Sequence, residues 1–144
     1  MDLNKTNQER YETGLETLRK MVTEKEVSLI EKIGDFFPDF SHTLVSFGFG
    51  DLYAREELSL RDREIITLTS LITQGAIEQL GFHVKAALRV GMTSTEILEL
   101  VLQCAGYAGF PRAVSALHVV EQVFKEEGIQ VNGKEGSSKE GNKE

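Results

Sequence analysis

The sequence is nearly free of cysteine: Cys104 is the only one among 144 residues. A single thiol cannot form an intrachain disulfide, and it cannot supply a CxxC motif for redox chemistry or for zinc. The histidines His42, His83 and His118 are far apart in the sequence, so we assemble no set of three metal ligands from them. We therefore expect neither a disulfide framework nor a metal site.

Long apolar runs are also missing. No window approaches the roughly eighteen apolar residues typical of a membrane-spanning helix. The first ten residues, MDLNKTNQER, contain no apolar core of the kind that directs export. These absences predict a cytoplasmic protein with no membrane partner.

The chain has no excess of positive charge. Its formal net charge is −7, its pI is near 5.1, and its sixteen Lys and Arg residues are scattered among acids. Binding a phosphate backbone requires a basic stripe, so nucleic acid is not an expected partner. The stretch Phe47-Gly48-Phe49-Gly50 has neither the lysine of a P-loop nor the strand that precedes a dinucleotide fingerprint. A nucleotide site is not expected either.

What the sequence does have is helical periodicity with well-marked ends. Capping-box patterns begin at Thr23 and Thr93, and Gly75 and Gly91 are placed to end two segments. Apolar residues recur at helical spacing over residues 7–22, 24–35, 40–47, 60–74, 76–90, 94–105 and 111–127. The prediction is an all-α protein of about seven helices with no convincing strand.

The length allows one globular domain, residues 1–130, followed by a tail over residues 131–144. The third helical segment is expected to stop at Gly48 and Gly50, and residues 51–58 to form a short connecting turn. The stretch NGKEGSSKEGNKE, residues 132–144, contains no apolar residue. It can bury nothing to offset its ordering entropy, so we expect it to be disordered.

Two titratable residues occupy positions that an ordinary amphipathic helix would not require. Glu64 falls among Leu60, Leu68 and Leu71 on the apolar side of its helix, and His83 flanks the apolar stripe of the next helix. A carboxylate in an apolar stripe needs a partner. We therefore expect Glu64 and His83 to converge at a helix junction, although an ordinary packing histidine and a surface glutamate paired with Arg55 or Arg63 are the structural alternatives.

The His83 helix also indicates assembly. Phe82 and Ala86 lie opposite its main apolar stripe, and the helix over residues 97–105 is apolar around most of its circumference. A helix that is apolar all round is buried all round. We therefore favour a homo-oligomer, the alternative being that other helices of the same chain cover both faces.

These residues also carry a resemblance. The segment FGDLYAREELSLRDREIITLTSL followed by IEQLGFHVKAALRVGMTSTEILELVLQCAGYAGFP resembles the carboxymuconolactone decarboxylase family, whose relatives include the AhpD-type alkylhydroperoxidases. The similarity covers roughly residues 11–124 and is strongest over residues 49–113. It implies an AhpD-like all-helical fold around a central antiparallel helix pair, assembled as trimers or hexamers. The residues that carry it are Gly50, Asp51, Arg55, Leu58, Arg63, Leu80, His83, Ala87, Gly91, Glu96, Tyr107, Gly109 and Pro111.

The family holds two chemistries, and the chain departs from the pattern of each. The AhpD-type site is a glutamate, a CxxC and a histidine; Glu64 and His83 match its ends, but Ala76 and Gln79 occupy the cysteine positions. A peroxide-reducing thiol cycle needs two thiols and is excluded. The decarboxylase branch needs no cysteine but has an acidic residue where this chain has Gln79. That acid is replaced either by Glu78, on another side of the helix, or by Glu64.

The resemblance therefore favours a cofactor-free decarboxylase acting on 4-carboxymuconolactone or a similar small carboxylated lactone. Loss of carbon dioxide leaves electrons delocalised toward the lactone carbonyl, so the enzyme must stabilise a dienolate and protonate carbon. His83 is the candidate proton donor. Glu64 is the candidate for orienting or charging the imidazole, or for acting as the acid if burial raises its pKa.

An anionic substrate also needs a cation. Arg112, beside Pro111 at a helix start, could combine its charge with free backbone N–H groups. Glu78 and Tyr107 are further substrate-binding candidates, with a solvated carboxylate and a packing aromatic as the structural alternatives. Additional candidate cations are Arg61, Lys85 and Arg89.

Two other functions remain open from the sequence. One is an oxidoreductase relative of the AhpD (peroxiredoxin-like) type that works without the CxxC. The other is a non-catalytic helical oligomer that binds a small ligand.

Overall fold

The computed structural model describes residues 2–131, and within that range the chain is all-α, as predicted. The tail predicted over residues 131–144 lies outside the described residues except for Val131. Seven α-helices and one π-helical segment make up the described chain: α1 (Asn7–Met21), α2 (Glu24–Phe36), α3 (Pro38–Thr43), η1 (Leu44–Tyr53), α4 (Leu60–Gln74), α5 (Ile77–Arg89), α6 (Ser94–Ala108) and α7 (Phe110–Glu126).

The predicted helix ends are confirmed where the sequence marks them by side-chain chemistry. The backbone N–H of Thr23 donates to the Glu26 carboxylate at 3.0 Å, and that of Thr93 donates to Glu96 at 2.9 Å. Gly75 ends α4 in the left-handed region, with φ of 73°. Only Gly75 and Ala76 separate α4 from α5, so Glu64 and His83 lie on consecutive helices.

The prediction that Gly48 and Gly50 end the third helix is wrong. The helix passes through both glycines as η1 and ends at Tyr53, so only residues 54–59 connect it to α4. A Cβ on Gly50 would overlap the carbonyl oxygen of Arg10 in α1. The glycine therefore permits a close approach of two helix backbones instead of terminating one of them.

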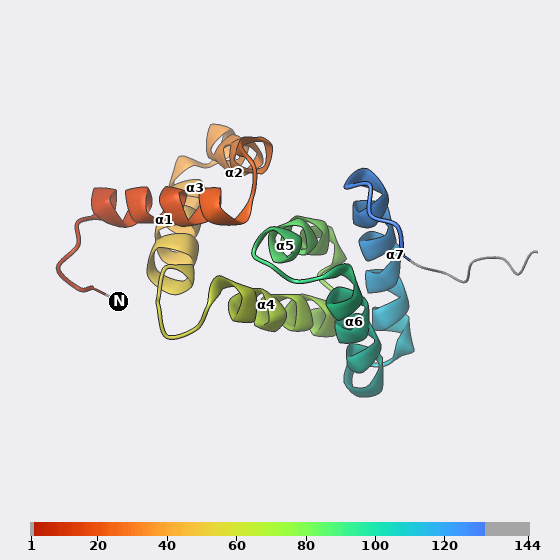
Figure 1. The fold of residues 1–144 in the computed structure, drawn as a ribbon. Helices are drawn as coiled ribbons and strands as arrows, with labels where there is room; N and C mark the ends of the chain where they lie inside the picture. The colour runs from red at the N-terminus through yellow and green to blue at the C-terminus, as the bar shows by residue number, and fades with distance from the viewer. Residues whose placement is uncertain (1, 132–144) are drawn as a thin grey trace, which may run out of the picture.

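The apolar side chains form two core clusters, and α5 contributes to both. Leu80, Val84 and Ala87 pack into the cluster formed by α4, α5, α6 and α7. Ala86 packs into the cluster formed by α1, α2 and η1, with Phe82 against it. In Figure 1, α5 accordingly lies between the first helices of the chain and the α6–α7 pair. His83 occupies the flank of α5 between these two faces.

This arrangement corrects the argument for assembly from the Phe82 face. Ala86 is fully buried within the chain itself, and Phe82 is half-buried against the α1–α2–η1 cluster. The helices that precede α4 cover the second apolar face of α5. That face therefore gives no reason for a second subunit.

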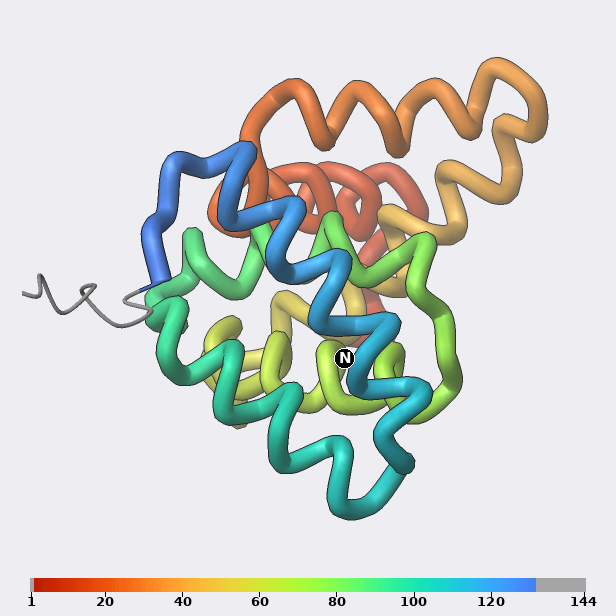
Figure 2. The backbone as a smooth tube through the Cα atoms, turned by 90° about the vertical axis from the view of Figure 1, so that its right-hand side faces the viewer, coloured from red at the N-terminus to blue at the C-terminus, as the bar shows by residue number. Residues whose placement is uncertain are grey.

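The last two helices run antiparallel to one another along the outside of the molecule, which both views show (Figure 1 and Figure 2). Pro111 lies in the first turn of α7, where its missing N–H costs no helical hydrogen bond. None of the described helices is both long enough and apolar enough to cross a membrane.

Candidate active site

Glu64 is the most deeply buried carboxylate of the site. It lies one turn into α4. Ser59 is the N-cap of this helix, and its side chain accepts from the backbone N–H of Asp62. Glu64 is 0% exposed and shares its face of α4 with Leu68 and Ile72, which are 1% exposed. A buried carboxylate is costly without a charged or hydrogen-bonding partner. The position of Glu64 in α4 therefore requires a partner side chain from another helix.

His83 of α5 is the partner of the Glu64 carboxylate. Its Nδ1 lies 3.1 Å from each carboxylate oxygen of Glu64, and its side chain is 16% exposed. The predicted convergence of the two residues is thus confirmed. A carboxylate accepts, so Nδ1 carries the proton in this contact and Nε2 is the nitrogen left for chemistry. A neutral His83 accepts a proton at Nε2, and an imidazolium paired with Glu64 can donate one there.

Aromatic rings surround the imidazole. The Tyr53 ring lies 6.4 Å from the His83 ring with 19° between the planes, and Phe82 meets it edge-on at 5.1 Å. Phe49 in turn stacks on Tyr53, with ring centroids 5.2 Å apart. The Tyr53 hydroxyl is hydrogen-bonded to the hydroxyl of Thr67. Sequence reasoning missed Tyr53, because its approach to His83 depends on η1 continuing past the glycines that the sequence suggested as its end.

Burial and the nearby negative charge of Glu64 raise the pKa of the Tyr53 phenol above its usual range. The phenol is therefore protonated at neutral pH. It is a polar but uncharged neighbour of the Glu64–His83 pair.

The predicted substrate-binding residues are exposed and come from three helices, α5, α6 and α7. Arg112 is exposed, and its guanidinium occupies the space next to Gly75 where a side chain would otherwise begin. Glu78 is exposed in the first turn of α5, and Tyr107 is 90% exposed near the end of α6. Among residues 2–131, no hydrogen bond or ion pair joins Arg112, Glu78 or Tyr107 to Glu64 or His83.

Two of the other candidate cations are engaged elsewhere. Arg61 pairs with Glu96 across α4 and α6. Lys85 pairs with Glu126 of α7 at 3.1 Å and approaches Glu26 of α2 at 3.9 Å. Both are structural links between helices.

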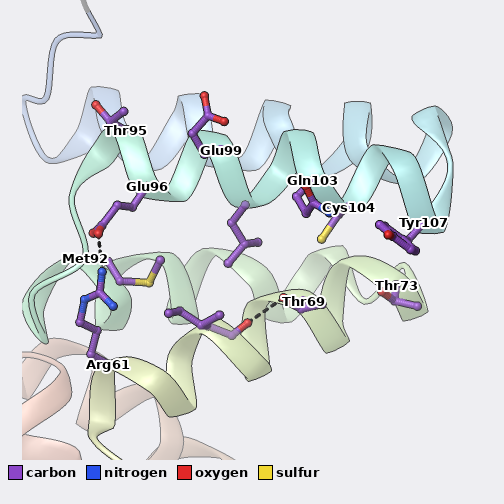
Figure 3. A pocket seen from close by; sticks show the side chains of 12 residues that line it. Arg61, Thr69, Thr73, Met92, Thr95, Glu96, Glu99, Gln103, Cys104 and Tyr107 are labelled. Atoms are coloured by element: carbon purple, nitrogen blue, oxygen red, sulfur yellow. Dashed lines mark hydrogen bonds and ion pairs between the residues drawn. The ribbon is translucent and has the colours of Figure 1, made fainter.

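A cavity of about 560 Å³ opens between α4 and α6 (Figure 3). Its lining includes Ile65, Met92, Leu100 and Cys104, with the Arg61–Glu96 ion pair at one end and Tyr107 toward the other, and it includes neither Glu64 nor His83. Burial raises the pKa of the Cys104 thiol, which therefore stays protonated at neutral pH. No three histidine, cysteine, aspartate or glutamate side chains gather to hold a metal anywhere in the described chain.

Comparison with known proteins supplies the context for this geometry. Residues 38–122 match the model of the carboxymuconolactone decarboxylase family. The chain is 35% identical over 124 residues to the 4-carboxymuconolactone decarboxylase of Acinetobacter baylyi, covering 85% of this chain and 92% of that protein.

Two further relatives extend the comparison. The nitrosuccinic acid decarboxylase of Metarhizium robertsii is 31% identical over 83 residues, which is 58% of each chain. An uncharacterized 15.0 kDa protein of Paracoccus denitrificans is 28% identical over 122 residues, covering 83% of this chain and 91% of that protein. The residues Glu64 and His83 both fall inside the region that matches the family model.

Proposed function

The chain belongs to the carboxymuconolactone decarboxylase family and is a carboxy-lyase of that kind, and from this premise we propose that it decarboxylates a small carboxylated lactone, 4-carboxymuconolactone or a close analogue. The observation that carries the proposal is the contact of the buried Glu64 carboxylate with Nδ1 of His83, 3.1 Å from both oxygens. The contact supports the proposal because an imidazole held by a carboxylate can carry a proton, and two relatives of this chain are named as decarboxylases.

The chemistry follows from the substrate class. The bond between the ring carbon and the carboxylate breaks, carbon dioxide leaves, and the electron pair delocalises toward the lactone carbonyl as a dienolate. Because the substrate itself accepts the electrons, the reaction proceeds without a cofactor as electron sink. One proton must then reach carbon, and His83 delivers it from Nε2 and is recharged from solvent.

Glu64 supports this step electrostatically. A carboxylate fixed on Nδ1 holds the imidazole in one orientation and stabilises the imidazolium that donates. The low exposure of the pair strengthens this interaction relative to the same contact in water. Arg112, which no ion pair of the described residues engages, is the proposed anchor for the substrate carboxylate; Tyr107 and Glu78 are proposed as weaker contributors to binding.

The direct test is release of carbon dioxide from 4-carboxymuconolactone and related lactones by purified protein. We expect turnover by the natural sequence, and Arg112→Gln should raise KM with kcat less affected if Arg112 binds the carboxylate. A well-folded protein that releases no carbon dioxide from any of these lactones would contradict the proposal. That result would leave a carboxy-lyase for another class of substrate, an oxidoreductase without the CxxC or a ligand-binding oligomer.

We also propose that the chain assembles as a trimer or hexamer, now on the evidence of α6 and α7. Leu102 is 61% exposed, Tyr107 90% and Phe110 69%, and Val114 and Leu117 are exposed further along α7. Several large apolar side chains exposed on two neighbouring helices favour a partner surface that covers them. Sedimentation equilibrium should give a multiple of the 16.1 kDa chain mass, reduced by Leu102→Glu.

Phe36→Glu is the matched control for this test, because Phe36 is 94% exposed but lies on α2. It should leave the mass unchanged. A monomer at micromolar concentration would remove the assembly proposal.

A further inference from the structure

Tyr53 joins three elements at the candidate active site. It is the last residue of η1, its hydroxyl is hydrogen-bonded to Thr67 of α4, and its ring packs against His83 of α5. Phe49, one turn earlier in η1, also stacks on the Tyr53 ring, with centroids 5.2 Å apart. The tyrosine is thus held at its hydroxyl and on its ring.

This placement limits the motion of the imidazole. A half-turn of the His83 ring would put Cδ2 in the place of Nδ1 and Cε1 in the place of Nε2, so that a carbon would face Glu64. The Tyr53 ring at 6.4 Å and the edge-on Phe82 ring at 5.1 Å are the aromatic neighbours of the imidazole, and packed neighbours of this kind oppose such a flip. The two carboxylate contacts at 3.1 Å define the preferred orientation, and the rings protect it.

The charged groups around His83 come from several helices. Glu64 faces it directly from α4, and the neighbouring Arg63 acts on Tyr53. Lys85 of α5 is engaged by Glu26 of α2 and Glu126 of α7, and Arg10 of α1 is paired with Asp51 of η1. Glu64 is therefore the closest charge to His83, and Tyr53 is the polar group beside both.

We propose that Tyr53, anchored by Thr67, is a positioning residue that keeps the His83 imidazole with Nδ1 on Glu64 and Nε2 free for proton transfer. Its consequence for turnover rests on the proposed decarboxylase function. Its consequence for the imidazole does not, because orientation and tautomer are properties of the free protein. The ring and the hydroxyl have separate tasks: the ring packs on the imidazole, and the hydroxyl fixes the ring.

The test uses nitrogen NMR of the imidazoles, which distinguishes protonation at Nδ1 from protonation at Nε2. The chain has three histidines, so His83 can be assigned by comparison with His83→Gln. In the natural sequence we expect neutral His83 to carry its proton on Nδ1. Tyr53→Leu should produce a mixture of tautomers.

Tyr53→Phe and Thr67→Val keep the ring and remove only the hydroxyl contact. Both should retain most of the Nδ1–H tautomer and show smaller tautomer changes than Tyr53→Leu, so the phenylalanine variant rescues the leucine one. In the carbon dioxide assay, kcat of Tyr53→Leu should fall roughly tenfold or more while KM changes less than about threefold. Thermal melts identify any variant that fails to fold, and the two conservative variants keep the test decisive in that case.

The chain offers a matched control in Tyr11, which stacks on His42 at 4.9 Å far from Glu64 in the sequence. Tyr11→Leu should leave the His83 tautomer unchanged. A folded Tyr53→Leu protein with an unaltered His83 tautomer overturns the proposal. If the tautomer changes as expected but the natural sequence releases no carbon dioxide, the positioning role stands and the proposed function fails.

Discussion

Residues 2–131 contain two stacked tyrosine–histidine pairs, and only one of them contacts a buried carboxylate. Tyr11 and His42 stack more closely, with ring centroids 4.9 Å apart and planes within 8°, whereas Tyr53 and His83 are 6.4 Å apart at 19°. His42 is exposed, and its Nδ1 lies 3.3 Å from the Ser46 hydroxyl. Nδ1 of His83 instead contacts a fully buried carboxylate. The stacking is common to both pairs, so the buried Glu64 makes the chemical difference.

Position in the fold explains why a carboxylate accompanies only one pair. His42 lies on the short helix α3 at the edge of the α1–α2–η1 cluster, where water solvates nearby acids such as Glu31 and Asp39. His83 lies on α5, which contributes to both cores. A carboxylate at that depth is stable only with a partner that donates a hydrogen bond to it or carries a positive charge.

The largest difference between the two pairs should appear when each imidazole is removed in turn. His83→Gln keeps volume and hydrogen bonding but cannot titrate near neutral pH, so kcat for carbon dioxide release should fall by roughly 10²- to 10⁴-fold. His42→Gln should leave kcat within about twofold, since surface substitutions away from a site have little effect. Normal turnover by a folded His83→Gln protein would exclude His83 as the acid.

The carboxylate can be tested by the same pairing. Glu64→Gln retains an acceptor for Nδ1 but removes the charge, and should lower kcat by about 10- to 100-fold. The double variant with His83→Gln should lose much less than the product of the single losses, because groups that act as a unit are not additive. Glu31→Gln, beside His42, is the control and should change nothing. Fully multiplicative losses would mean that Glu64 and His83 do not act together.

Alkaline pH should lower the free energy of unfolding through the buried Tyr53 phenol. The folded pKa of Tyr53 is raised by burial and by the charge of Glu64, so above the unfolded pKa of about 10 the unfolded chain releases a proton that the folded chain retains. Its favourable contribution is therefore present below pH 10 and declines as pH rises beyond it. The stability difference between the natural sequence and Tyr53→Phe should change by up to about 1.4 kcal/mol per pH unit in that range.

Urea unfolding at pH 9, 10 and 11 measures this change, with Tyr53→Phe losing less stability on alkalinisation than the natural sequence. Parallel pH curves for the two proteins would show that Tyr53 ionises as readily folded as unfolded.

The smallest effect is expected from Cys104, which lies outside both pairs in the cavity between α4 and α6. Its thiol is buried and protonated, and no second cysteine exists to complete a redox cycle. Cys104→Ser should leave kcat within about threefold while lowering the free energy of unfolding by about 1 kcal/mol. A thiol-dependent peroxidase activity abolished by this change would contradict the exclusion of that chemistry.

The sequence by itself determined the features that depend on neighbouring residues along the chain. Capping side chains such as Thr23 and Thr93 lie within a turn of the groups they bind, and helical periodicity is visible in a single segment. The same periodicity exposed the conflict of Glu64 in an apolar stripe, and the adjacency of the two helices made His83 its natural partner. The all-α class and the contact between Glu64 and His83 were therefore predictable.

Only the tertiary structure decided what depends on contacts between distant segments. Gly50 reads as a helix end until α1 lies against it, and Phe82 reads as an interface residue until the α1–α2–η1 cluster covers it. Tyr53 reaches His83 only because η1 continues to its last turn beside α4. Such contacts join residues dozens of positions apart, and their energies come from shape and burial that no local pattern encodes.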